Sequence, residues 1–270
     1  MQAGGCRFDA DRLHHFIMVR SQAFKDILKK ENSILWCLLA FQAGFINAGG
    51  FIACHRFVSH VTGYGTHVGL SFSQEGFWLA LEMMVAPLSF IAGAAYSAFL
   101  IDRPFYQQKR VRVGYALVTQ SALLFLVFVL GEWGMFGEFG EPLILQRDFV
   151  LLFLLCFICG SQNATFGCLT NGQVRTTHMT GLSTDLGMNL VRIPFLNVDE
   201  KEKTYQKKLN WLRVFTFASF MVGSGISAYI FSHLAGYHGF IVPALTSLAV
   251  LLLAKKNMDK HEQEALANSP

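Results

Sequence analysis

Charged residues are scarce in this chain. Only 15% of its 270 residues are Asp, Glu, Lys or Arg, whereas 53% are hydrophobic and 26 are Phe. An ordinary soluble domain carries about 25% charged residues, so this class is excluded and the lipid bilayer is indicated as the main partner. The net charge of +4 comes mostly from short segments between apolar runs, where Lys and Arg set orientation and meet anionic lipid. A nucleic-acid partner is not expected.

The sequence also lacks the common catalytic signatures. It contains no zincin motif, no Gly-x-Ser-x-Gly and no P-loop, so we expect no enzyme and no cofactor. Cys156-x-x-Cys159 stands in an apolar run without a second pair and indicates plain apolar helix. His60 and His178 have no close-spaced set of further ligands, so we expect no metal site.

Apolar runs long enough to cross a bilayer alternate with two shorter polar segments. A crossing of the roughly 30 Å core needs about 20 helical residues. The six candidate spans are about 34–54, 77–101, 113–131, 148–169, 212–234 and 238–254. The polar segments, about 60–73 and 177–191, are too short for further spans, since 14 residues reach only about 21 Å as a helix. They predict half-helices or re-entrant segments enclosed by protein or facing water.

These short segments are copies of one motif. Residues 59–69 recur 118 positions later as residues 177–187, with His, Thr, Gly, Thr and Gly identical in register. A weaker echo relates residues 90–98 to residues 220–228, both Phe-x-x-Gly-x-x-x-Ser-Ala. The pattern predicts an all-α polytopic membrane protein: six transmembrane helices in two inverted three-helix repeats, each with a short broken or re-entrant helix.

Charge placement gives the orientation and the domains. Basic clusters at 20–30, 103–112, 201–213 and 255–260 fall on one side of the membrane after six crossings, and the acidic segment 132–148 falls on the other. Both termini are therefore expected in the cytoplasm. We expect a cytoplasmic amphipathic segment at 1–33, a membrane domain at 34–254 and a frayed cytoplasmic tail at 255–270. Repeat one covers about 34–131 and repeat two about 148–254.

The same motifs carry a family resemblance. Residues 43–51, Val58 to Gly63, Gly160-x-Gln162-Asn163-Ala164 and 175–187 resemble the YoaK family of bacterial inner-membrane proteins, domain of unknown function 1275. The resemblance implies a small, multi-pass protein of the bacterial inner membrane and names no activity. The chain departs from the pattern at Asn47, where Asp is usual, and at Tyr64, where Asn is usual. A titrating or cation-binding role of that Asp would be lost here.

The polar residues of the repeated segments are the candidate site. Asn47 and Asn163 can bind a polar solute or hold helices together. Arg175 can add to the positive field of a half-helix or lie at the interface. The substrate-binding candidates are Asn47, His60, Thr62, Thr66, Gln162, Asn163, Arg175, His178, Thr180 and Thr184.

Asp185 and His67, which align between the copies, are the candidates for proton coupling. A carboxylate inside a membrane is costly unless it is paired, protonated or wet. We expect Asp185 to pair with His178 or Arg192, two helical turns away, or else to touch cytoplasmic water. The predicted function is a secondary transporter or facilitator of a small polar or anionic solute, coupled to protons. The alternatives are a passive channel-like pore and, less favoured, an intramembrane enzyme. The solute, coupling ion, direction and oligomeric state are not encoded in recognisable motifs.

Overall fold

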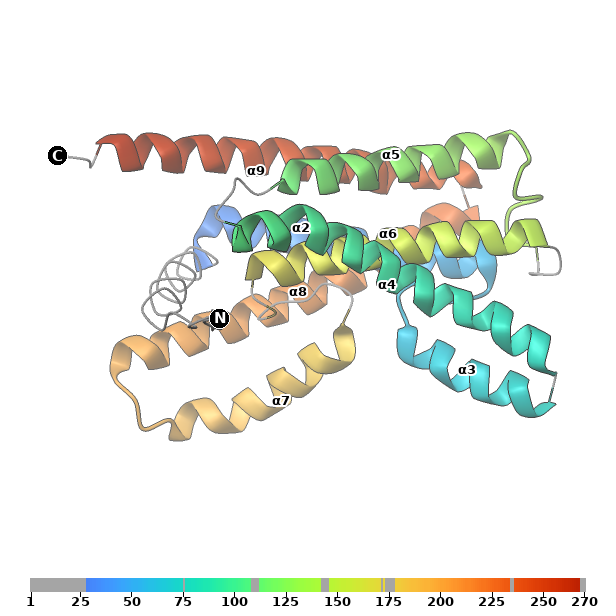
Figure 1. The fold of residues 1–270 in the computed structure, drawn as a ribbon. Coiled ribbons are helices and arrows are strands. Elements are labelled where there is room, and N and C mark those ends of the chain that lie inside the picture. Colours follow the sequence, from blue (N-terminus) through green and yellow to red (C-terminus); the bar gives the residue numbers. More distant parts are fainter. Residues whose placement is uncertain are drawn as a thin grey trace, which may run out of the picture.

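The computed structural model describes residues 28–74, 76–107, 112–141, 146–170, 172, 178–233 and 236–267. This part of the chain forms α-helices and one short 3₁₀-helix, with no strand (Figure 1). The elements are α2 (Lys30–Cys54), α3 (Val61–Gln74), α4 (Phe77–Tyr106), α5 (Val113–Glu132), α6 (Gln146–Thr170), α7 (Met179–Phe195), α8 (Glu200–His233), η2 (Tyr237–Phe240) and α9 (Ile241–Ala267).

Six of the described helices are long and apolar enough to cross a membrane: α2, α4, α5, α6, α8 and α9. They lie side by side and alternate in direction along the chain (Figure 1). The predicted count of six spans is confirmed, and the chain is a multi-pass helical protein of the membrane type. Most of the predicted N-terminal amphipathic segment lies outside the described residues.

Two of the long helices, α8 and α9, extend far beyond their predicted bounds. α8 begins at Glu200 rather than near residue 212. Asp199 Oδ1 accepts a hydrogen bond of 2.9 Å from the backbone N–H of Glu202, which is the bond of an N-cap residue. α9 continues to Ala267, so the predicted fraying is wrong for residues 255–267. No Gly or Pro stands between Pro243 and Ala267 to end that helix.

α2 and α8 are held together by a reciprocal glycine contact. Gly44 faces the backbone carbonyl of Phe220, and Gly223 faces the backbone carbonyl of Phe41. A Cβ atom at either glycine would collide with that carbonyl oxygen. The two helix backbones can therefore approach as closely as they do only with glycine at both positions.

α4 and α6 make the same contact with each other. Gly93 faces the carbonyl of Phe157, and Gly160 faces the carbonyl of Phe90. All four glycines belong to a Phe-x-x-Gly sequence, and one glycine of each pair belongs to the echo found in the sequence. In Figure 1, α2 and α8 run away from the end where α2 begins and α9 ends, whereas α4 and α6 run towards it.

A serine one turn after a contact glycine strengthens each pair. Ser227 donates a hydrogen bond of 2.6 Å to the carbonyl of Phe45 on α2. Ser97 donates one of 2.9 Å to the carbonyl of Ser161 on α6. Each accepting residue directly follows the contact glycine of its helix. The two pairs thus share both their backbone contact and their hydrogen bond.

The two short helices lie on one side of the bundle. α3 packs on α4, and α7 packs on α8. With 14 and 17 residues, they reach about 21 Å and 26 Å, less than the roughly 30 Å core. In Figure 1 each begins near the middle of the molecule's length, and they run towards opposite ends.

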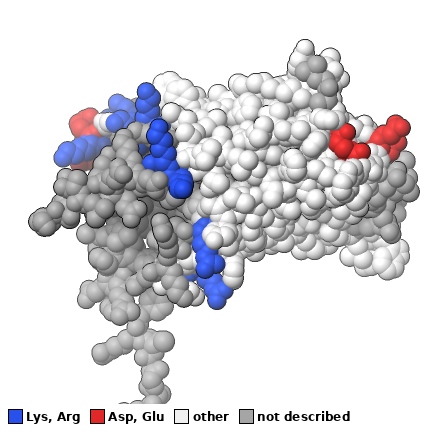
Figure 2. All heavy atoms as spheres, turned by 90° about the horizontal axis from the view of Figure 1, so that it is seen from above, with Lys and Arg blue, Asp and Glu red and all other residues white. Residues whose placement is uncertain are grey.

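Charge separates the two ends of the bundle. In Figure 2 the visible Lys and Arg side chains gather at the end where α2 begins and α9 ends, and the opposite end shows acidic side chains. The face between them is uncharged, as expected of a surface in contact with lipid. We call these the basic end and the acidic end. Lys30, Lys208 and Lys255 mark the first, and Glu138 and Glu141 mark the second.

Candidate functional site

Each short helix begins directly after a histidine whose ring covers a glycine of the first turn. Val61 follows His60, and the imidazole of His60 occupies the space where a Cβ of Gly63 would lie. His178 and Gly181 repeat this arrangement at the start of α7. The glycine of each His-x-Thr-Gly sequence therefore makes room for the imidazole. Both histidines are exposed at the first turn, where free backbone N–H groups point out of a helix.

Asn47 fixes the segment that leads into α3. Its Oδ1 accepts hydrogen bonds from the Ser59 backbone N–H at 3.2 Å and from the Ser59 hydroxyl at 2.8 Å. Only the acceptor capacity of the amide is used in these bonds, so an Asp carboxylate could accept them equally. The buried Oδ1 of Asn163, its counterpart on α6, has no hydrogen-bond partner among the described residues. That oxygen stays a candidate for binding a donor group.

Asp185 pairs with a residue on another helix. Its Oδ2 lies 3.8 Å from Nη2 of Arg213 on α8, so the expected partners His178 and Arg192 are replaced by Arg213. The Arg213 side chain is 10% exposed, and the Asp185 side chain is 46% exposed. Within the described part of the chain, Nε and Nη1 of Arg213 have no hydrogen-bond partner. A buried cation with free donors is equipped to bind an anion.

The buried Oδ1 of Asn210 also lacks a partner in the part of the chain that the structure describes. Asn210 precedes Arg213 by three residues on α8, which places both on one face of the helix. Free donors and a free acceptor thus occur on the same helix face. This cluster was not predicted, because residues 201–213 read in the sequence as a basic loop.

The other predicted residues divide by exposure. Gln162 is buried and donates to the carbonyl of Leu39 at 2.8 Å and to Gln42 Oε1 at 3.3 Å, so it joins helices. Arg175 lies outside the described residues. The exposed residues are polar and lie on α3 and α7: Thr62, Thr66, His67, Thr180 and Thr184.

A buried polar network in the bundle was not predicted from the sequence. Gln120 donates to the hydroxyls of Ser161 at 3.1 Å and Thr165 at 3.2 Å. Thr165 in turn donates to Ser97 at 3.2 Å. The only signal in the sequence is the spacing of Ser161 and Thr165, which puts both on one face of α6. The hydroxyl groups of this network join α4, α5 and α6 and so contribute to helix packing.

The core beside α3 explains one departure from the family pattern. Tyr64 is 3% exposed and belongs to a buried apolar cluster with Cys54, Cys156 and Cys159. These cysteines form no disulfide among the described residues, and Cys156 and Cys159 lie in plain apolar helix, as predicted. The tyrosine ring anchors α3 to the bundle, a role that the shorter Asn would not fill.

The fold and the site define a multi-pass helical membrane protein with two short helices that start alike. The family described as Protein of unknown function (DUF1275) matches residues 35–253, so the chain belongs to this family and the resemblance noted in the sequence is confirmed. No curated protein and no solved structure matches the chain.

Proposed function

We propose that this protein is a secondary transporter of a small polar or anionic solute. The observation that carries the proposal is the equivalent start of α3 and α7, each with an exposed histidine and free N–H groups near the middle of the bundle. Helix starts at this depth favour anions through the helix dipole. Inverted repeats are the architecture that produces such a pair of starts.

The inversion is supported by the helix pairs. α2 with α8 and α4 with α6 share the glycine contact and the serine bond, and the two pairs run in opposite directions. A rotation of about 180° around an axis in the membrane plane would exchange them. The same rotation would exchange α3 with α7, which lie on one side of the bundle.

The faces at the beginnings of α3 and α7 expose mostly polar or open positions, whereas Leu70, Phe72, Leu190 and Val191 are exposed further along. Thr62, Thr66 and Thr184 are exposed, and no atom of the described residues occupies the space beside Gly65 and Gly187. Polar groups at membrane depth are tolerated where they face water or protein. We therefore assign these faces to a water-filled path for the solute.

The Asp185–Arg213 pair supplies the coupling. The more exposed Asp185 can take up a proton, which would release Arg213 to bind the anionic group of the solute. His67 stands at the corresponding position of α3 and is the second candidate for proton transfer. If Asp185 keeps its charge throughout, the same path would act as a passive pore, which is the second candidate function.

The charged ends support one orientation of the bundle. We place the basic end in the cytoplasm, because Lys and Arg are retained on that side. Both termini then lie in the cytoplasm, and the loop with Glu138 and Glu141 lies outside. The resemblance to inner-membrane proteins supports a place in the bacterial inner membrane.

A solute screen followed by flux measurement tests the proposal. Small carboxylates, phosphate, sulfate and polyols are added to the purified protein, and a ligand of the folded state raises its melting temperature. Each stabilising solute is then followed into proteoliposomes with and without a pH gradient. We expect uptake driven by the gradient, its loss in Asp185→Asn, and its retention in the matched control Asp102→Asn. Flux without a response to the gradient identifies the passive pore, and a complete absence of flux refutes transport.

A further inference from the structure

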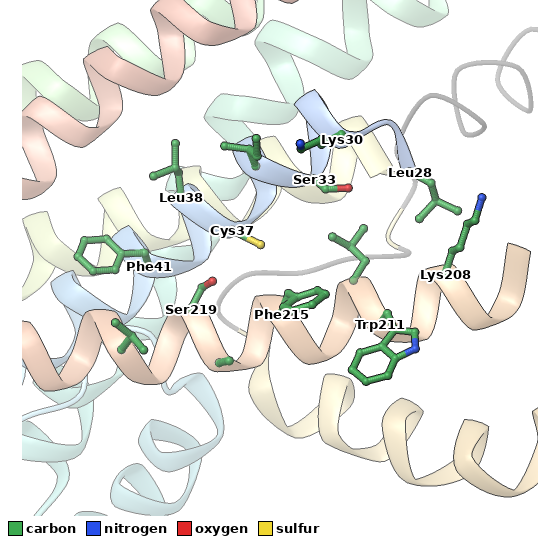
Figure 3. A pocket seen from close by; sticks show the side chains of 14 residues that line it. Leu28, Lys30, Ser33, Cys37, Leu38, Phe41, Lys208, Trp211, Phe215 and Ser219 are labelled. Atoms are coloured by element: carbon green, nitrogen blue, oxygen red, sulfur yellow. The ribbon is translucent and has the colours of Figure 1, made fainter.

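A groove of about 670 Å³ lies between α2 and α8 at the basic end (Figure 3). Its walls are mainly apolar and include Phe41 and Cys37 on α2 and Phe215 and Ser219 on α8. Its volume falls in the range of about 300–1,000 Å³ of sites that hold one small molecule. Nothing in the proposed solute path uses these residues.

The glycine contact creates the groove. α2 and α8 touch where Gly44 and Gly223 face the partner backbone, and the groove opens from there towards the beginnings of both helices. Lys30 precedes Gly44 by 14 residues, about 21 Å along a helix. Half of a bilayer with its headgroups is about 20–22 Å thick. The groove therefore runs from the headgroup level to near the middle of the membrane.

Among the described residues that line the groove, the two cations, Lys30 and Lys208, lie at its shallow end. Lys30 and Lys208 line it where α2 begins, next to Trp211, a residue type typical of the membrane interface (Figure 3). The corresponding positions of the α6 and α4 pair carry Gln146 and Trp78, so the two lysines are not a general feature of this helix contact. The groove is apolar, is about as deep as one leaflet of the bilayer and has positive charge at its shallow end. These properties are complementary to a lipid with an anionic headgroup.

We propose that this groove binds one anionic phospholipid. The headgroup phosphate lies between Lys30 and Lys208, and one acyl chain runs past Phe215 towards Phe41. The lipid fills the opening between α2 and α8. It thereby stabilises this helix pair, which is in direct contact at Gly44 and Gly223. The proposal is independent of the transported solute.

Native mass spectrometry of the full chain in detergent tests the binding. We expect retained phosphatidylglycerol and far less phosphatidylcholine at equal concentration. Lys30→Gln with Lys208→Gln should weaken phosphatidylglycerol retention roughly thirtyfold, the equivalent of about 1 kcal/mol per lysine. The control Lys255→Gln with Lys256→Gln removes the same charge from the same end on α9, outside the groove. Equal losses in the two double variants, or equal retention of both lipids, would overturn the proposal.

A cross-link identifies the occupant directly. Benzoylphenylalanine at Phe215 keeps an aromatic side chain in the groove and reacts on illumination with whatever lies there. In vesicles of phosphatidylglycerol and phosphatidylcholine, an adduct with the mass of phosphatidylglycerol supports the proposal. An adduct with a peptide from residues 1–27 or with a second copy of the chain overturns it. Ser219→Trp, which fills the groove, should abolish the lipid adduct while the melting temperature shows that the fold persists.

Discussion

Arg213 on α8 lies 3.8 Å from a carboxylate oxygen of Asp185 on α7, and the two partners differ in exposure. The arginine is nearly buried, whereas the aspartate is about half exposed. Arg213 therefore stays charged in a place where it needs an anion, since a guanidinium is not deprotonated in proteins. The carboxylate of Asp185 supplies this anion. The pair connects the second short helix to the glycine-packed bundle.

Removing one partner of this pair should cost more than removing both. Asp185→Asn leaves Arg213 nearly buried without its anion, and we expect a loss of about 1–2 kcal/mol, between the values for exposed and buried pairs. The double variant Asp185→Asn with Arg213→Gln should regain part of that loss, because no unpaired charge remains. Chemical unfolding in detergent gives the free energy of unfolding of the wild type, of each single variant and of the double variant. Strictly additive losses would show that the two residues are not coupled.

Glycine at the contact between α2 and α8 is required by sterics. Gly223→Ala places a methyl group against the carbonyl of Phe41, and we expect a loss of about 1–3 kcal/mol from overpacking. Gly225→Ala, two residues further on the same helix, meets open space and should gain about 0.5–1 kcal/mol. The melting temperatures of the two variants in detergent should therefore shift in opposite directions.

The second helix pair extends this test. Gly93→Ala and Gly160→Ala should each destabilise as Gly223→Ala does, because both glycines face a carbonyl in the same way. If Gly93→Ala leaves the stability unchanged while Gly223→Ala lowers it, the two helix pairs are not equivalent. This result would also remove the main support for the repeats.

The sequence predicts the spans well because hydropathy and length alone decide which helices cross a bilayer. The two short helices were also predicted, since their repeated motif is polar and too short to cross. The early start of α8 was missed because residues 200–208 are highly charged, and the cap at Asp199 was not recognised there.

The partners of polar residues were harder to predict. Spacing arguments search only the residue's own helix, so Asp185 was assigned to His178 or Arg192 and not to Arg213 on the next helix. A serine in an apolar run, such as Ser97, does not reveal which neighbour it faces. Only the packing of α4 on α6 brings Ser97 to Ser161.

Asn47 should tolerate the residue that is usual in the family pattern. Asn47→Asp keeps an oxygen that accepts from Ser59, so we expect unchanged stability at neutral pH. Asn47→Leu has a similar size and no acceptor, and it leaves the Ser59 donors unpaired at a cost of about 1–3 kcal/mol. Melting temperatures of the purified variants separate these outcomes. If Asp and Leu destabilise alike, the amide N–H₂ rather than the oxygen is needed at this position.

Six crossings with the basic end in the cytoplasm make a specific prediction for accessibility. Single cysteines are placed at Glu138 and at Arg112 in a background whose six native cysteines are alanine. Glu138 belongs to the acidic end and Arg112 directly precedes α5, at the basic end. We expect an impermeant maleimide to label position 138 in intact cells, and position 112 only after permeabilisation, because Lys and Arg are retained on the cytoplasmic side. The reverse labelling pattern would mean that the bundle has the opposite orientation, with Asp185 and Arg213 on the outer side. In that orientation, protons from outside would have to protonate Asp185 and release Arg213. A single crossing, α5, separates positions 112 and 138. Labelling of both positions in intact cells would place them on the same side of the membrane and would contradict this crossing.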